Sequence, residues 1–97
     1  MLHIVTSSPF SSQSLQTCLR YSSHEDEIIL MQDAVFAALA ETPYANALAQ
    51  RSGQVYVYAP DIQARGVEKK LVSGFPQIDN NAFVALTVQH TQQINWQ

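Results

Sequence analysis

Short apolar runs recur along the chain, and the segments between them have the apolar spacing of helices. A continuous apolar run is typical of a parallel strand that is covered on both faces. We predict strands over Leu2–Val5, Ile28–Met31 and Val55–Ala59, a short strand near Phe75–Ile78, and a final extended segment over Ile94–Trp96 on the sheet edge.

Capping residues and apolar periodicity predict helices between these strands. The predicted helices run from a cap at Ser11 or Ser12 to about Tyr21, from a cap at Asp33 over Ala34–Ala40, from Pro43 to about Arg51 with Gly53 past the end, from Pro60 to Gly66, and from a cap at Asp79 or Asn80 through Val88. His24–Glu27 is predicted to be a solvated turn. The alternation predicts one α/β domain over residues 1–97, with a mainly parallel sheet flanked by helices in three layers, as in Rossmann-like and flavodoxin-like folds.

The chain carries few charges for its size. Only 13% of its residues are charged, against about 25% in a typical soluble domain. Gln, Ser, Thr and Asn supply part of the polar surface, and a Gln-rich surface alone could keep a monomer in solution. The remaining shortfall favours surface that is buried against other chains, because interface cores are depleted in charge. The net charge of −3 predicts no direct binding of free nucleic acid.

The sequence pattern favours the cytoplasm. No apolar run approaches the ~20 residues that span a bilayer, and residues 1–5 lack the pattern of a signal peptide. A single cysteine cannot form an internal disulfide, which fits a reducing compartment.

Several kinds of site are excluded by residue spacing. The glycines at 53, 66 and 74 cannot form a dinucleotide-binding loop or a P-loop, and one thiol cannot form a redox C-x-x-C pair. His3, His24 and His90 are too scattered to suggest a zinc site. We therefore predict neither a cofactor nor a metal ion.

Cys18 is the candidate residue for covalent chemistry. Its thiolate could accept a sulfur atom as a persulfide and pass it on, if the thiol were accessible and its pKa lowered. The alternative is core packing, because Cys18 shares an apolar helical stripe with Leu15 and Leu19. Both interpretations stay open on the sequence alone.

Charged residues follow two of the predicted strands. Asp33 and Asp61 fall at the carboxyl edge, where open α/β sheets bind ligands, although each also fits the start of a helix. Arg65, Lys69 and Lys70 could meet an anionic partner surface or an RNA backbone inside an assembly, or they could form a solvated loop.

Three aromatic residues are candidate interface anchors: Tyr56, Tyr58 and Trp96. Strand alternation places the two tyrosines on one face of the sheet. The alternative places all three at the edge of the core.

The order of local phrases along the chain resembles the DsrH/TusB family. Each phrase is short, but the ordered set covers nearly the whole chain. The phrases are Leu2–His3, Ser8–Phe10, Ser14–Leu19, Leu30–Val35, Val57–Gly66, Phe83–Val88 and the terminal Trp96.

This resemblance implies a DsrE/F/H-like fold and assembly with TusC-like and TusD-like (or DsrF-like and DsrE-like) subunits into a paired heterotrimer. In the tRNA branch such a complex relays persulfide sulfur from a TusA-like donor to a TusE-like carrier, for 2-thiolation of the wobble uridine. The principal cysteine belongs to the TusD-like partner, and this chain has no thiol after its central strand. Cys18 resembles the cysteine of DsrH-type chains from sulfur oxidisers, which makes it a candidate secondary persulfide carrier.

The leading hypothesis is therefore a largely structural TusB-like subunit that is not catalytic alone. The alternative within the family is a DsrH-like subunit that serves dissimilatory sulfur oxidation with a DsrC-type carrier. From other classes, a free-standing thiol enzyme would use Cys18, and a binding module would hold a small ligand near Asp33 and Asp61.

Overall fold

Five short strands form one sheet in the part of the chain that the computed structural model describes, residues 1–40, 42–51, 54–72 and 74–97. The strands are β1 (Leu2–Val5), β2 (Glu27–Leu30), β3 (Val55–Tyr58), β4 (Gln77–Ile78) and β5 (Gln93–Trp96). They lie in the order β4-β3-β2-β1-β5, and each neighbouring pair is parallel. The predicted α/β fold with a mainly parallel sheet is confirmed.

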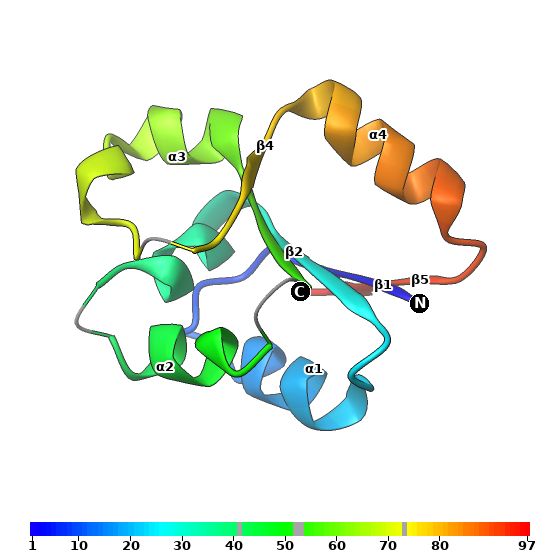
Figure 1. The fold of residues 1–97 in the computed structure, drawn as a ribbon. Helices are drawn as coiled ribbons and strands as arrows, with labels where there is room; N and C mark the ends of the chain where they lie inside the picture. Colours follow the sequence, from blue (N-terminus) through cyan, green and yellow to red (C-terminus); the bar gives the residue numbers. More distant parts are fainter. Residues whose placement is uncertain (41, 52–53, 73) are drawn as a thin grey trace.

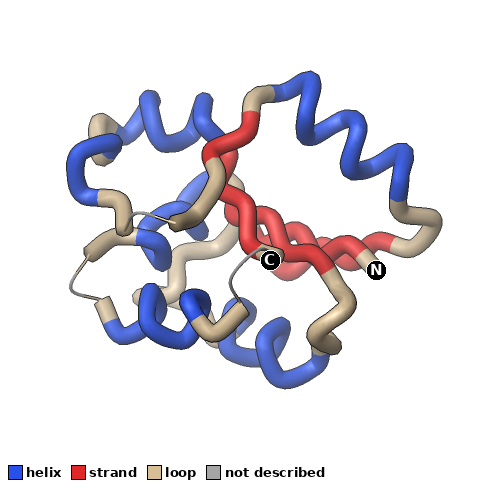
Figure 2. Tube along the Cα trace, in the orientation of Figure 1, coloured by secondary structure: helices blue, strands red, loops and turns tan. Residues whose placement is uncertain are grey.

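Helical segments connect the strands and cover both faces of the sheet (Figures 1 and 2). They are α1 (Ser14–Tyr21), the 3-10 segment η1 (Gln32–Ala38), α2 (Pro43–Ala49), α3 (Ala59–Arg65), the 3-10 turn η2 (Glu68–Lys70) and α4 (Asn80–Gln89). In Figure 1, α1 and α2 lie below the sheet and α4 lies above it. Because α4 connects β4 at one edge to β5 at the other, it is the crossover on its face of the sheet.

The predicted strands are found, with differences in their bounds. β3 ends at Tyr58, because the predicted Ala59 is the first residue of α3, β4 is shorter than the predicted Phe75–Ile78, and β5 begins one residue before the predicted Ile94. β2 begins at Glu27 and ends at Leu30, whereas the apolar run predicted Ile28–Met31. Glu27 joins the strand because its backbone N–H donates to the carbonyl of Met1, and its carboxylate has partners on β3 and after α4. The expectation of a solvated turn over His24–Glu27 is correct for His24 and Glu25, which are exposed, and wrong for Glu27.

The start of α1 differs from the prediction. The helix begins at Ser14 with Gln13 as its N-cap, so neither Ser11 nor Ser12 is the cap residue. Both serines donate their backbone N–H groups to the carbonyl of Ser8 and therefore belong to a preceding turn. The hydroxyl of Ser12 still accepts the backbone N–H of Ser14, at 3.1 Å, which satisfies one donor at the helix start.

The alanine-rich segment also differs. It is a 3-10 segment that begins at Gln32, so Asp33 lies inside its first turn and is not an N-cap. The segment ends at Ala38, because Leu39 forms a bridge with Leu71, and the N–H of Ala40 donates to the carbonyl of Lys70. These contacts with a distant segment end the predicted helix two residues early.

The other helix boundaries follow the sequence closely. α2 starts at Pro43 and ends at Ala49, slightly before the predicted Arg51, and Gly53 lies outside the described residues. Gly66 ends α3 in the left-handed conformation, with φ of 64°, which glycine adopts without strain. The carboxylate of Asp79 accepts the backbone N–H of Ala82 and caps α4 as predicted.

Strand alternation divides the apolar side chains between two clusters, one on each face. We call them the α1-side core and the α4-side core. Buried residues of the α1-side core are Val5, Leu15, Cys18, Ile28, Leu30, Ala34, Val35, Ala37, Ala38, Leu48, Val55, Val57, Ile62 and Val67. Those of the α4-side core are Leu2, Ile4, Ile29 and Leu86. The face that α4 covers therefore holds a much smaller core than the face that α1 and α2 cover.

In the described residues, no helix has the length and apolar character that crossing a membrane would require.

Candidate functional site

Cys18 lies on the inward face of α1, and its side chain is fully buried in the α1-side core. Burial raises the pKa of the Cys18 thiol to about 12, although the positive charge of Arg51 acts in the opposite direction. Because the thiolate is the nucleophilic form, this thiol is protonated and inaccessible in the isolated folded chain. Whether Cys18 carries sulfur inside a complex stays a prediction.

Arg51 has a structural role that the sequence analysis missed. Its guanidinium group donates to the backbone carbonyls of Leu19, Ser22 and Ser23 and to the hydroxyl of Ser22, at 2.7–3.2 Å. These groups lie at the carboxyl end of α1, where a cation is favoured by the helix dipole. Arg51 therefore connects the segment after α2 to the end of α1, and no local pattern in the sequence indicates this contact.

The carboxyl edge of the sheet brings together Asp33, Asp61 and Arg65. The guanidinium Nη2 of Arg65 donates to Oδ1 of Asp33 at 2.8 Å, and its Nη1 lies 3.6 Å from Oδ1 of Asp61. Oδ2 of Asp61 accepts the backbone N–H of Gln32 at 2.6 Å, which holds Gln32 at a φ of 52°. Asp61 also lies in the first turn of α3, as predicted.

These contacts decide what the carboxyl edge offers to a ligand. Both carboxylates bond to groups of the same chain, and Arg65 additionally lies 6.0 Å from the centre of the Phe36 ring. These contacts therefore cross-link η1 to α3 at the carboxyl edge. Asp33 is exposed and Asp61 is half-buried, and both carboxylates are paired within the chain.

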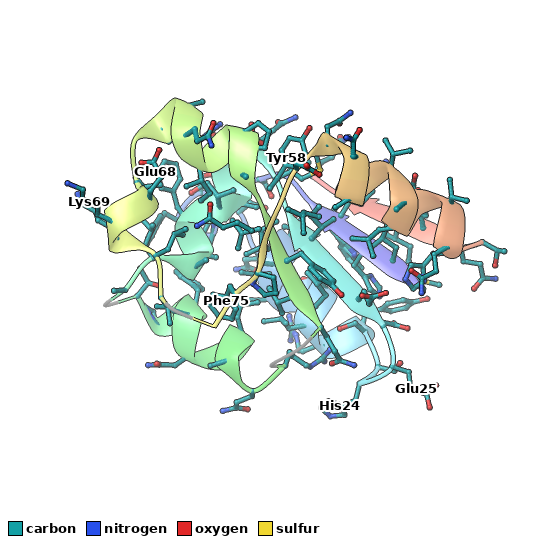
Figure 3. All side chains as sticks on the ribbon, turned by 45° about the horizontal axis from the view of Figure 1, so that its top comes forward. His24, Glu25, Tyr58, Glu68, Lys69 and Phe75 are labelled. Carbon is teal, nitrogen blue, oxygen red and sulfur yellow. The ribbon has the colours of Figure 1, made fainter. Side chains whose placement is uncertain are left out.

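The predicted basic cluster divides into two parts. Arg65 pairs with the two aspartates, whereas Lys69 and Lys70 are exposed on η2. Figure 3 shows Lys69 pointing away from the body of the molecule. Both lysines line a surface hollow of about 430 Å³, together with Leu39, Ala40 and Thr42.

A buried histidine pairs with an acid on the α1 side of the sheet. Nδ1 of His3 accepts the indole N–H of Trp96 at 3.0 Å, so the hydrogen-bond pattern assigns the ring proton to Nε2, which donates to Asp26 at 2.8 Å. Asp26 also accepts the N–H of Ser23 and the amino group of Met1. Burial alone would raise the pKa of Asp26, but these hydrogen bonds hold it well below its usual range.

A second histidine pairs with an acid on the α4 side. Glu27 accepts hydrogen bonds from the hydroxyl of Tyr56 and from Nε2 of His90, the latter at 2.7 Å. Burial opposes ionisation of Glu27, yet the bonds from Tyr56 and His90 lower its pKa. The bond to Glu27 raises the pKa of Tyr56 to about 12, with a smaller contribution from burial.

The three aromatic interface candidates are each partly exposed, with the polar atom bonded inside the chain. Tyr56 donates to Glu27, Trp96 donates to His3, and Tyr58 donates to Asn80 at 2.9 Å. Figure 3 shows Tyr58 at the start of α4. Their polar atoms therefore have structural partners, and the role of their rings in subunit contact stays a prediction.

The structure does not bring the candidate residues together in one centre. The one thiol is buried in the core, and the acids at both ends of the sheet bond to groups of the same chain. In residues 1–40, 42–51, 54–72 and 74–97, no three histidine, cysteine or acidic side chains are grouped so that they could hold a metal ion. The polar side chains described above hold the helices and strands of the chain itself in place.

Comparison with known proteins identifies the family of the chain. A family model described as "DsrH like protein" matches residues 7–93. The chain is 41% identical to Protein TusB of Pectobacterium parmentieri and 35% identical to Protein TusB of Yersinia pestis, each over 96 residues that cover 99% of this chain and 100% of the relative.

Solved structures support the fold. The ychN protein of E. coli superposes with a TM-score of 0.78 at 20% identity, over 97% of each chain. The protein Tm0979 of Thermotoga maritima superposes with a TM-score of 0.64 at 26% identity, over 95% of this chain and 97% of that one. The match of the family model over residues 7–93, together with the TusB relatives that are 35–41% identical over 99% of the chain, shows that the chain belongs to the DsrH/TusB family.

Proposed function

We propose that this chain works as the TusB-type subunit of a TusBCD-type complex, which relays persulfide sulfur for the 2-thiolation of the wobble uridine of tRNA. The observation that carries the proposal is the match of essentially the whole chain to curated relatives named Protein TusB, at 35–41% identity. The buried thiol supports a structural role, because a protonated thiol inside a core cannot attack a persulfide.

In this role the chain completes the complex and shapes its docking surface. Its partners are TusC-type and TusD-type subunits, with the main reactive cysteine on the TusD-type chain. A TusA-type donor and a TusE-type acceptor meet the assembly, which we place in the cytoplasm. Cys18 is at most a secondary carrier, and it would first have to leave the α1-side core.

The other hypotheses gain less support. Curated relatives named TusB favour tRNA thiolation over a DsrH-like role in sulfur oxidation. Burial of Cys18 gives no support to a free-standing thiol enzyme. A ligand near Asp33 and Asp61 would have to displace the bonds that these carboxylates make with Arg65 and Gln32.

Co-expression with the TusC-type and TusD-type chains of the same genome tests the proposal. An affinity tag on the TusD-type chain leaves both termini of this chain undisturbed. We expect all three chains to co-purify, and intact-mass analysis after loading by a persulfide donor to find the added sulfur on the TusD-type chain. In a strain that lacks its own TusB-type gene, this chain should restore 2-thiouridine in tRNA.

Two results would contradict the proposal. One is a wild-type chain that remains monomeric and ignores both sister chains. The other is sulfur transfer at a useful rate by the purified chain alone.

A further inference from the structure

Helix α4 is attached to the sheet by little buried surface. Of its ten residues only Leu86 is buried, with 9% of its surface exposed, and Phe83 packs beside it while staying partly exposed. Val88 is almost fully exposed. Helix α1, on the other face, buries Leu15 and Cys18 almost completely. Because burial of apolar surface is the main force that holds a helix on a sheet, α4 is the more weakly held of the two helices.

Hydrogen bonds supply much of the remaining attachment of α4. Just after the helix, Nε2 of His90 bonds to one carboxylate oxygen of Glu27 on β2 at 2.7 Å. The other carboxylate oxygen of Glu27 accepts the hydroxyl of Tyr56, so this one side chain holds both β3 and the end of α4. At the start of the helix, Tyr58 donates to Asn80 at 2.9 Å. These groups are all partly exposed or exposed, and water competes for such bonds, so each contributes less than a buried apolar side chain.

The strands on either side of α4 are held by contacts that do not involve it. β5 pairs with β1, and Trp96 packs against the α1-side core with its indole N–H bonded to His3. β4 pairs with β3 at the other edge of the sheet. In Figure 1, α4 spans from β4 to β5 above the sheet. The connections at Asp79 and at residues 90–92 are therefore the points at which α4 can separate from a sheet that remains intact.

We propose that α4 is a flap that opens from the sheet as a unit while the α1-side core stays folded, and that the bond between His90 and Glu27 is its latch. Isolated helices shorter than about 12–15 residues are marginal in water, so α4, with ten residues, loses its helical structure when it leaves the sheet. Opening uncovers the strand residues of the α4-side core, Leu2, Ile4 and Ile29. The fold thus gives one face of the sheet a covered and an uncovered state. The opening belongs to the isolated chain, so it does not depend on the proposed function.

Native-state hydrogen exchange at increasing low concentrations of urea tests the proposal on the purified chain. We expect the amides of α4 to exchange through an opening that is at least about a hundred-fold more frequent than the one that exposes the amides of β1 and β2. The urea dependence of the α4 opening should also be smaller, because this opening exposes less surface than unfolding of the whole chain. A single opening, with one urea dependence for all of these amides, would overturn the proposal.

Two neighbouring residues of β2 provide a matched pair of variants. Ile28 and Ile29 are both fully buried, but Ile28 lies in the α1-side core and Ile29 in the α4-side core. Ile28→Val should accelerate exchange in β1 and β2 about five-fold and leave exchange in α4 unchanged, because the contacts that it weakens persist when α4 opens. Ile29→Val should also accelerate exchange in α4, about three-fold, since its side chain loses the cover of α4 on opening. Equal acceleration of α4 by the two variants would mean that the chain opens only as a whole.

His90→Ala tests the latch. It removes the bond to Glu27 after the end of α4 and should accelerate exchange in α4 about ten-fold. His24→Ala is the matched control and should leave exchange unchanged, because His24 is exposed and points away from the body of the molecule in Figure 3. Circular dichroism of both variants checks that the fold is retained. If α4 of His90→Ala exchanges at the wild-type rate, the bond to Glu27 is not the latch and that part of the proposal is wrong.

Discussion

Helices α1 and α4 cover opposite faces of one sheet, and their outward sides differ. The inward residues of α1, Leu15 and Cys18, are buried, while its outward side carries Gln16, Thr17 and Arg20. α4 also packs inward, but its outward side carries uncharged residues, among them Val84 and Val88. The inward pattern of a helix indicates where a core lies, whereas the outward composition indicates whether water or another chain covers it.

The largest expected effect on stability comes from truncating one buried leucine in each of the two cores. We expect Leu15→Ala to lower the free energy of unfolding of the isolated chain by about 3–4 kcal/mol, because Leu15 is 1% exposed in the larger core. Leu86→Ala should cost less, about 2 kcal/mol, because Leu86 is 9% exposed in the smaller core. Urea unfolding followed by circular dichroism measures both.

If Leu86→Ala lowered the free energy of unfolding as much as Leu15→Ala or more, the comparison of the two cores would be wrong. Such a result would mean that the α4 face contributes as much to the monomer as the α1 face. The exposed Val84→Ala serves as the control and should change stability by less than about 0.5 kcal/mol.

Local patterns in the sequence were sufficient to predict most of the fold. Apolar runs located the strands, Pro43 and Asp79 located two helix starts, and Gly66 located a helix end, because each acts within a few residues of itself. The apolar stripe through Cys18 also supported the core interpretation, in agreement with its complete burial.

What the sequence could not supply depends on partners far along the chain. Asp33 fits an N-cap locally, yet Arg65, 32 positions later, binds its carboxylate. Glu27 looks like part of a solvated turn until His90 is placed beside it. Arg51 has no local signal at all, although it binds the end of α1. These contacts become visible only after the chain has folded.

A smaller effect concerns the two acid–histidine pairs, one on each face. The pKa of Asp26 and that of Glu27 are lowered in the folded chain. A lowered pKa contributes stability that is present above the unfolded value, near 4, and is lost as the pH falls through the folded value. We therefore expect stability to fall as the pH is lowered below about 4.

Substitution of Asp26 and of Glu27, one at a time, shows how much of the acid-induced loss of stability each residue causes. Asp26→Asn should cost about 2 kcal/mol at pH 7 and flatten the acid slope, because Asp26 accepts bonds from His3, Ser23 and the amino group of Met1. Glu27→Gln should flatten it less, since the pKa of Glu27 is less strongly lowered. Glu25→Gln is the control, because Glu25 is exposed and points outward in Figure 3. An unchanged slope in Asp26→Asn would show that the α1-side pair does not drive acid unfolding.

The smallest expected effect on stability concerns Cys18, a reactive type of residue that α1 contains and α4 lacks. A raised pKa of about 12 leaves the thiolate fraction at pH 8 roughly a thousand-fold below that of an ordinary thiol, and burial adds a steric barrier. We expect a thiol reagent at pH 8 to label the folded chain very slowly and the urea-unfolded chain at once.

Cys18→Ala should cost only about 1 kcal/mol of stability, because it removes a single buried sulfur atom. It should also leave 2-thiouridine formation by the co-expressed complex unchanged. Fast labelling of the assembled complex, or loss of 2-thiouridine in Cys18→Ala while the complex remains intact, would show that assembly exposes this thiol. α1 would then contribute chemistry as well as a core.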